Sequence, residues 1–404
     1  MKIISAKYIF TGKELLIDKA IAFKKSIVKI DTLSKLREEF KDAKVYAFEY
    51  NHIIYPGFIN PHVHLEFSAN RSKLDYNGFT KWLYSVIANR EELISQLNPQ
   101  IIHNEIESML KSGITTFGAI SSYGAEMQEC KNAPQRVVFF NEIIGSSPAM
   151  VDALFNDFKA RVQESLNLND DRFISGVAIH SPYSVHPILI REALKIAKAK
   201  NMPTTAHFLE SPSEREWLES ASGEFREFFE KFLKTTKPVN SIKGFLEAFN
   251  DKPTLFTHCT QCKNEEFEIL NKNDHSIIHC PRSNRLLDCG KLDITKPKNL
   301  LLGTDGLSSN YSLSILDELK IALFMHTNIK AKELSTKLLQ AVTINAAKAL
   351  NLKIGQIKED YLADFAVFKL PNDFEYNDIG SATLHTILNC NSAKSVFIGG
   401  QKVF

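Results

Sequence analysis

The chain has 404 residues and a mass of 45.7 kDa, which is enough for two or three domains or for one large α/β barrel with a small additional domain. Hydrophobic residues make up 44% and charged residues 24%, a balance that excludes a disordered or fibrous chain. Lys and Arg number 49 and Asp and Glu 47, with no concentrated basic segment, so we do not expect nucleic acid as a partner.

The N-terminal segment and the cysteines indicate a cytoplasmic location. Lys7 and Lys13 interrupt the first apolar residues, and no later segment approaches the roughly 20 apolar residues of a membrane span. Six cysteines are too few for a disulfide framework and fit reduced thiols. Cys259 and Cys262 form a single CxxC without a matching second pair, so we do not expect structural zinc there.

Both ends of the chain are rich in short strands. The predicted strands are residues 3–10, 20–30, 45–48, 364–368 and 395–404, the last with a hairpin turn at Gly399-Gly400, and residues 35–40 are predicted to be helical. These two ends predict one small β-sandwich domain, formed by residues 1–54 and 355–404.

Between these ends, apolar strands alternate with amphipathic helices. The predicted strands are 54–59, 114–120, 136–142, 173–179, 203–207, 254–258, 276–279 and 300–303; the clearest helices are 98–112, 187–200, 213–234, 263–272 and 313–326. Eight such units predict a (β/α)8 TIM barrel over residues 55–354, whose active site would lie at the carboxyl ends of the strands. No GxGxxG follows any of these strands, which argues against a dinucleotide-binding fold.

Ionisable side chains end most of these strands. The first strand continues into His62-Val63-His64, and later strands end at or beside His180, His207, His258, His279 and Asp305. Residues two apart in a strand face the same side, so His62 and His64 can reach one ion. With His207 and Asp305 they would form a set of three imidazoles and one carboxylate that suits zinc or another borderline divalent metal.

Two further residues near this set have more than one interpretation. Glu210 follows the fifth strand by three residues, where a carboxyl group can act as general acid or base, although a helix N-terminus or a surface ion pair would also explain it. For His258 there are three interpretations: a second metal ligand, a buried structural histidine, or a base that orients water. We favour the last.

Several segments together resemble the amidohydrolase superfamily. They are PGFINPHVH (56–64), HSPYSV (180–185), HFLE (207–210), HC (258–259), HCPRSN (279–284) and LGTDGLSSN (302–310), and they cover essentially the whole chain in order. The combination is similar to the branch that contains adenosine-type nucleoside deaminases and triazine chlorohydrolases. The family often has a second glycine where this chain has Asp360, a residue that tolerates left-handed backbone angles.

The resemblance implies one divalent ion, Zn²⁺ or Fe²⁺, held by His62, His64, His207 and Asp305. Glu210, His258 and Asp305 would be the catalytic residues. Binuclear members have a carboxylated lysine on strand four, whereas this chain has His180 there, which implies one metal ion. The predicted substrate-binding residues are His180, Trp82, Glu142, Arg282, Ser283 and Asn284.

Within that branch the pattern is most similar to the aminofutalosine deaminases of menaquinone biosynthesis. The implied reaction is hydrolytic release of ammonia from the 6-amino group of an adenine nucleoside, 6-amino-6-deoxyfutalosine, which carries a benzoate. The alternatives are deamination of S-adenosylhomocysteine or methylthioadenosine, a chlorohydrolase reaction on a related ring, and a binding scaffold without catalysis. The expected partner is a small molecule rather than a membrane, and a homodimer is common among relatives.

Overall fold

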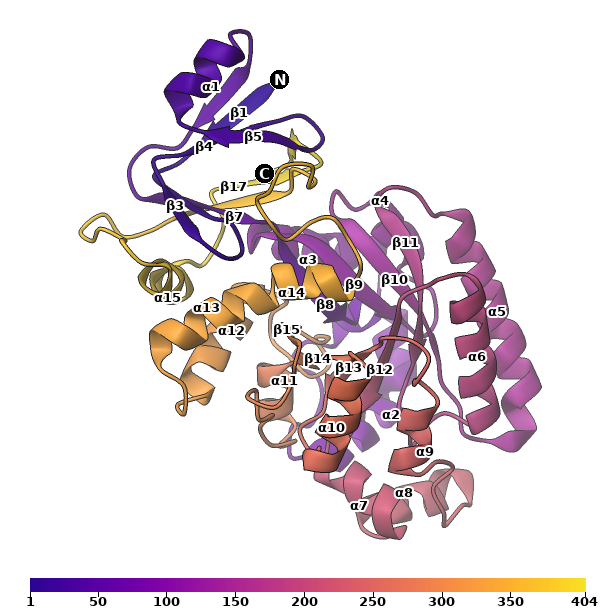
Figure 1. Cartoon of the computed structure of the whole chain (residues 1–404). Helices are drawn as coiled ribbons and strands as arrows, with labels where there is room; N and C mark the ends of the chain where they lie inside the picture. The colour runs from indigo at the N-terminus through magenta and orange to yellow at the C-terminus, as the bar shows by residue number, and fades with distance from the viewer. The chain divides into compact units, whose positions relative to one another are not determined.

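The computed structural model describes residues 1–404 and contains two compact units (Figure 1). The first comprises Met1–Asn60, Ile106–Phe117 and Ser314–Phe404, and the second comprises Pro61–Glu105 and Gly118–Leu313. None of the helices has both the length and the apolar character that a transmembrane segment needs. The domain boundaries predicted after residues 54 and 354 stay a prediction.

Two sheets lie in the first unit. One has the order β5–β4–β1–β6, with bounds Ile27–Asp31, Ala20–Phe23, Lys2–Ser5 and Lys44–Ala47. The other has the order β18–β17–β16–β7–β2–β3, with bounds Gln401–Lys402, Ser395–Ile398, Phe365–Lys369, His52–Pro56, Tyr8–Phe10 and Leu15–Ile17. Strand β16 pairs antiparallel with β7, which joins the two ends of the chain in one sheet.

Apolar side chains from both sheets share one buried core. Ile21 and Phe23 of β4 belong to the same cluster as Phe365 of β16 and Phe397 of β17. The rings of Phe23 and Phe365 meet edge to face, with centroids 5.3 Å apart. The sheets therefore pack face to face, which confirms the predicted small β-sandwich built from both termini.

The third sheet is the barrel, with eight strands in the order β15–β14–β13–β12–β11–β10–β9–β8. From β8 to β15 the bounds are Phe58–Val63, Ile114–Ser121, Arg136–Ile143, Phe173–Ile179, Thr204–Phe208, Leu255–His258, Ser276–His279 and Leu300–Leu302. The N–H of Asp305 donates to the carbonyl oxygen of His62 at 3.1 Å, which links the chain beyond β15 back to β8. This arrangement confirms the TIM barrel and places the carboxyl ends of its strands on one rim.

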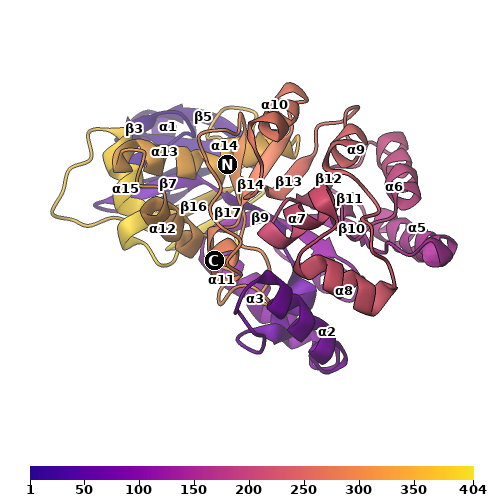
Figure 2. The same cartoon turned by 90° about the horizontal axis from the view of Figure 1, so that it is seen from below.

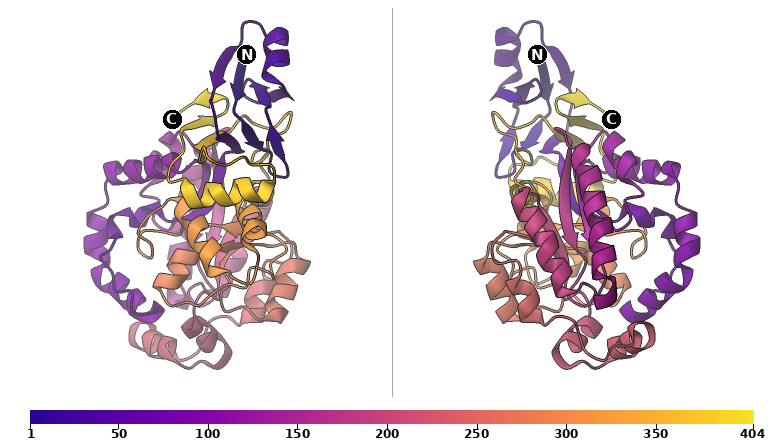
Figure 3. Two further views of the ribbon diagram at one scale, coloured as in Figure 1. Left: turned by 90° about the vertical axis from the view of Figure 1, so that its left-hand side faces the viewer. Right: turned by 90° about the vertical axis from the view of Figure 1, so that its right-hand side faces the viewer.

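Helices surround the strands. Helices α5 (Val151–Asn167) and α6 (Pro187–Ala199) lie side by side against β10 and β11 (Figures 2 and 3). Helices α12 (Ile315–Met325), α13 (Ala331–Ala341) and α15 (Ile379–Asn389) pack together in the first unit (Figure 3). The remaining helices are α1 (Leu33–Glu39), η1 (Leu65–Asn70), α2 (Phe79–Ser95), α3 (Pro99–Lys111), α4 (Met127–Asn132), η2 (Pro148–Met150), α7 (Pro212–Ser220), α8 (Glu224–Leu233), α9 (Ile242–Glu247), α10 (Asn264–Lys272), α11 (Pro281–Leu286) and α14 (Ile344–Ala349).

Three local predictions have informative outcomes. The single strand predicted at 54–59 is wrong, because Gly57 separates β7 from β8. A Cβ on Gly57 would lie 2.0 Å from Oγ1 of Thr115, so the chain changes sheets where no side chain fits. The helix predicted at 213–234 is two helices, since Ala221 and Gly223 have positive φ angles. Asp360 has φ +69°, as the predicted left-handed turn requires.

Candidate active site

Three imidazoles converge at the rim of the barrel. His62 lies in β8 and His64 directly follows it, while His207 lies in β12. The Nε2 atoms of His64 and His207 are 3.3 Å apart. Oδ1 of Asp305 lies 3.7 Å from Nε2 of His62 and 3.7 Å from Nε2 of His64. Ligand atoms of the three histidines lie within 4.8 Å of one another, so one ion can contact all of them.

The chemistry of these donors fits a divalent metal ion. Burial lowers the pKa of His64 to about 3 and holds the pKa of His207 well below its usual value, so both rings keep a lone pair at neutral pH. Nδ1 of His207 donates to the carbonyl oxygen of His180 at 2.9 Å, which leaves Nε2 as the acceptor beside His64. Three imidazoles and one carboxylate are ligands that zinc and iron accept.

Two glycines allow the loop after β15 to approach the histidines. A Cβ on Gly303 would lie 3.1 Å from Cβ of His62, and a Cβ on Gly306 would lie 2.8 Å from Cβ of His64. Between them, Asp305 has φ +59°, an angle that non-glycine residues rarely adopt. The close approach and the unusual backbone angle together direct the Asp305 carboxylate toward the rings.

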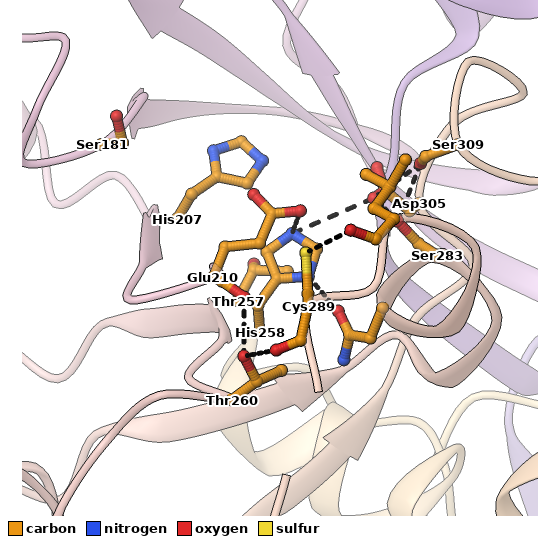
Figure 4. A network of polar contacts seen from close by, with 12 residues as sticks. Ser181, His207, Glu210, Thr257, His258, Thr260, Ser283, Cys289, Asp305 and Ser309 are labelled. Carbon is orange, nitrogen blue, oxygen red and sulfur yellow. Dashed lines mark hydrogen bonds and ion pairs between the residues drawn. The ribbon is translucent and has the colours of Figure 1, made fainter. Parts of the chain in front are cut away.

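Hydroxyl groups hold Asp305 in place and favour its ionised form. Oδ2 accepts hydrogen bonds from Ser283 at 2.7 Å and from Ser309 at 3.0 Å (Figure 4). Oδ1 accepts one from the N–H of Gly306. Burial opposes ionisation, but the contact with His62 and the nearby His258 and His64 hold the pKa of Asp305 well below its usual value. Asp305 therefore offers a negatively charged oxygen to a metal ion.

Glu210 lies beside this group on the loop after β12. Its Oε1 is 3.4 Å from Nε2 of His258 (Figure 4). The carboxylate of Glu214 accepts the backbone N–H of Leu209 at 3.1 Å and of Glu210 at 2.7 Å, which fixes the loop although Leu209 has φ +46°. Burial, with Asp305 and Glu214 nearby, raises the pKa of Glu210 well above its usual value. Its surroundings thus favour the protonated form of Glu210.

His258 ends β13 with φ +71° and points its ring toward Glu210 and Asp305. Nδ1 donates to Oδ1 of Asn284 at 2.8 Å, because an amide oxygen can only accept. Burial lowers the pKa of His258 to about 4. The ring is therefore neutral at pH 7, with Nε2 as a hydrogen-bond acceptor.

A search against protein families matches residues 53–403 to the amidohydrolase family. The chain belongs to this family. It is 43% identical to the aminodeoxyfutalosine deaminase of Nitratiruptor sp. over 100% of this chain and 99% of that protein. It is 34% identical to an adenosine deaminase of Helicobacter pylori, covering 100% of this chain and 99% of that protein. The crystal structure of Helicobacter pylori aminofutalosine deaminase in complex with methylthio-coformycin superposes with a TM-score of 0.93, at 33% identity and with full coverage of both chains.

The rim of this amidohydrolase opens into a cavity of about 550 Å³ within the second unit. Its lining residues include His64, His207, Glu210, His258 and Asp305. The wall also includes Trp82, Glu142 and His180, three of the residues predicted to bind substrate.

These three wall residues have defined neighbours. Nδ1 of His180 is within hydrogen-bond distance of the hydroxyl groups of Ser184, at 2.6 Å, and Ser181, at 3.0 Å. Burial raises the pKa of Glu142 to about 7, and Ser122 donates to its Oε2. The indole N–H of Trp82 donates to the carbonyl oxygen of Ser308 at 2.8 Å.

The other three residues predicted to bind substrate do not line this cavity. Ser283 donates to Asp305, and Asn284 accepts from His258, so both support residues that face the cavity. Arg282 is 3% exposed, donates to the carbonyl oxygen of Ser312 and stacks on Tyr311.

Sequence reasoning missed Glu214 and the outer wall of the cavity. A signal for Glu214 exists: Ser211 and Glu214 have the S-x-x-E spacing of a helix start, and the hydroxyl of Ser211 caps α7. The outer wall comes from α2 and α8, whose aromatic and aliphatic residues have the ordinary pattern of amphipathic helices. That pattern does not distinguish a cavity wall from a packed core.

Proposed function

We propose that this amidohydrolase hydrolyses the 6-amino group of an adenine nucleoside, with 6-amino-6-deoxyfutalosine as substrate. One observation carries the proposal: a carboxyl group with a raised pKa, Glu210, lies next to a neutral imidazole, His258, and beside an ionised carboxylate, Asp305. The 43% identity to an aminodeoxyfutalosine deaminase over the whole chain supports the choice of substrate.

The metal site has a defined part in this proposal. His62, His64, His207 and Asp305 would hold one divalent ion, Zn²⁺ or Fe²⁺. When bound, such an ion supplies Lewis-acid chemistry and lowers the pKa of a water molecule toward about 7. The protein supplies the positions and the proton transfers.

Glu210 would transfer a proton to the ring, and His258 would orient the attacking water. Protonated Glu210 would donate to ring nitrogen N1 while water adds to C6, so that negative charge does not accumulate on the ring. Nε2 of His258 is an acceptor because Nδ1 donates to Asn284, so it would orient the attacking water. Of the two protons of the water, one would replace the proton that Glu210 gives to N1, and Asp305 would take the other and pass it to the leaving amino group. The amidine carbon then becomes a carbonyl and one ammonia is released.

The test is ammonia release from aminodeoxyfutalosine, methylthioadenosine, S-adenosylhomocysteine and adenosine. We expect the first to have the highest kcat/KM, and the Glu210→Gln enzyme to lose at least about 10²-fold in kcat with unchanged metal content. Glu230→Gln removes an exposed carboxylate of α8 and serves as the matched control. A higher kcat/KM for methylthioadenosine or S-adenosylhomocysteine would support the alternative deaminase. Chloride release from a chlorinated ring would support the chlorohydrolase. No turnover of any substrate would support a binding scaffold.

The proposal also includes the biological setting. A nucleoside deaminase with this substrate would act in menaquinone biosynthesis, in the cytoplasm, and we expect a homodimer. Measuring menaquinone in cells that lack the protein tests the pathway, and sedimentation of the purified protein tests the assembly.

A further inference from the structure

One face of helix α2 forms a continuous wall of the cavity. Trp82, Leu83, Val86, Ile87 and Arg90 all line it, and their spacing places them along one side of the helix. The indole of Trp82 donates to the carbonyl oxygen of Ser308, close in the chain to Asp305, so this end of the wall lies next to the metal-ligand group. At 1.5 Å per residue, Arg90 lies about 12 Å farther along the helix axis.

The charges in the cavity are separated along this wall. Arg90 is the single Lys or Arg among the lining residues, whereas the lining carboxyl groups are Glu142, Glu210 and Asp305. Each of these carboxyl groups lies within 4 Å of a histidine of the inner site. The outer part of the cavity therefore combines one cation with no acidic side chain.

Arg90 is positioned but not neutralised. Its guanidinium lies over the ring of Tyr123, 5.1 Å from the centroid, and no carboxylate forms an ion pair with it. The guanidinium is exposed and belongs to the cavity lining, so it remains open to an anion. Arginine binds carboxylates through two parallel hydrogen bonds, and stacking on an aromatic ring limits its orientation.

Apolar side chains form much of the remaining cavity wall. Phe228, Phe229 and Phe232 of α8 line the cavity, as do Met150 and Leu154. The ring of Phe228 lies 5.0 Å from the ring of Phe232 and 5.4 Å from the ring of Phe229. Such a wall suits an aromatic group rather than a hydrated chain, because aromatic rings gain from edge and offset contacts.

We infer that Arg90, stacked on Tyr123, is a specificity-determining residue that binds a carboxylate at the far end of the substrate, while the α8 aromatic residues contact an aryl group. This inference rests on the proposed deaminase function and narrows its substrate class to adenine nucleosides whose 5′ substituent ends in an aryl carboxylate. Methylthioadenosine has no charge for Arg90. S-adenosylhomocysteine also ends in a carboxylate, but the ammonium group beside that carboxylate would find no acidic partner in the outer cavity, and it has no aryl group for the α8 aromatic residues.

The kinetic test compares two substrates in the wild-type enzyme and in three variants. For Arg90→Gln we expect kcat/KM for aminodeoxyfutalosine to fall about 10- to 100-fold, mainly through KM, and kcat/KM for methylthioadenosine to stay within about threefold. Arg90→Lys should recover part of the loss. Lys231→Gln is the control, because Lys231 lies over the rings of Tyr84 and Phe232 but does not line the cavity. Raising the salt concentration should raise the wild-type KM for the carboxylate substrate alone.

A binding experiment keeps this inference separate from the proposed function. Calorimetry with the Glu210→Gln enzyme and with Glu210→Gln/Arg90→Gln measures affinity for both nucleosides without turnover. We expect the second change to weaken aminodeoxyfutalosine about 10-fold or more and to leave methylthioadenosine unchanged. Equal losses for both nucleosides, no loss for either, or a loss caused by Lys231→Gln instead would overturn the role of Arg90. If the wild-type enzyme releases no ammonia from any nucleoside, the proposed function fails, and the binding data still decide the role of Arg90.

Discussion

Replacing Glu214 with glutamine should change how the stability of the protein depends on pH. The Glu214 side chain is fully buried and accepts the backbone N–H groups of Leu209 and Glu210. Burial raises its pKa to about 7 from the ordinary 4.5. In the folded protein this carboxyl group therefore holds its proton over a pH range in which the unfolded chain has already lost it.

The size and sign of the effect follow from this difference. Each pKa unit corresponds to about 1.4 kcal/mol, so about 2.5 units amount to about 3 kcal/mol. Because the folded pKa is above the unfolded one, the free energy of unfolding is highest below pH 4.5 and decreases as the pH rises to about 7. Glutamine has no such titration, although it leaves one N–H without an acceptor at every pH, which costs about 1–3 kcal/mol.

The assay is urea denaturation of wild type and Glu214→Gln at pH 4.5 and pH 8. Relative to wild type, the variant should gain about 3 kcal/mol in the free energy of unfolding between the two pH values. Glu216→Gln, two residues away at an exposed position, is the control and should show no such change. If the free energies of unfolding of Glu214→Gln and wild type differ by the same amount at both pH values, the argument that burial disfavours the ionised form of Glu214 is refuted.

Three further predictions concern the groups that hold the site. Asn284→Ala removes the acceptor for Nδ1 of His258, so we expect kcat to fall about 10- to 100-fold with metal content unchanged, measured by steady-state kinetics and metal analysis. Ser283→Ala removes one of two hydroxyl donors to Asp305 and should weaken metal binding about 10-fold in a chelator competition, since a hydrogen bond to a charged group contributes about 1.5–3 kcal/mol. Removing the metal with a chelator should lower the Tm, and Zn²⁺ should restore it, because a ligand that binds the folded state alone stabilises that state; a Tm that does not respond would contradict the metal site.

Much of the inner site was predictable because its residues sit at the ends of strands. In a barrel, strand ends meet at one rim whatever the loops do, so the sequence alone predicts that His62, His64, His207 and Asp305 lie together. The i, i+2 rule for strands then places the first two on one side. The TIM barrel and the β-sandwich followed from the alternation of elements in the same way.

The supporting residues were not predictable from such patterns. Ser283 and Asn284 lie in the motif after β14, but whether they face the cavity or stand behind His258 and Asp305 depends on how α11 leaves the strand. The missing information is in the backbone: Leu209, His258 and Asp305 all have positive φ angles. Non-glycine residues rarely adopt these angles, and tertiary contacts help to hold them, so sequence periodicity does not report them.

The outer cavity illustrates a different limit. Arg282 is one of the predicted substrate-binding residues, yet it packs on Tyr311, whereas Arg90 of α2 lines the cavity. Arg282 stands beside a strand end, which made it conspicuous in the sequence. Arg90 lies eight residues beyond Trp82 on a helix, and its position in space becomes clear only when α2 and the barrel rim are seen together.

The two carboxyl groups nearest His258 have opposite proton affinities, and this difference assigns their roles. Oε1 of Glu210 and Oδ2 of Asp305 lie 3.4 Å and 3.9 Å from the same nitrogen, Nε2 of His258. Hydrogen bonds from Ser283 and Ser309 and the surrounding imidazoles favour the anion at Asp305, whereas burial favours the acid at Glu210. Two neighbouring carboxyl groups in such different environments do not compete for one role, and we therefore propose the ionised one as metal ligand and the protonated one as general acid. A negative charge on Asp305 also makes ionisation of Glu210 less favourable, so each group strengthens the assignment of the other.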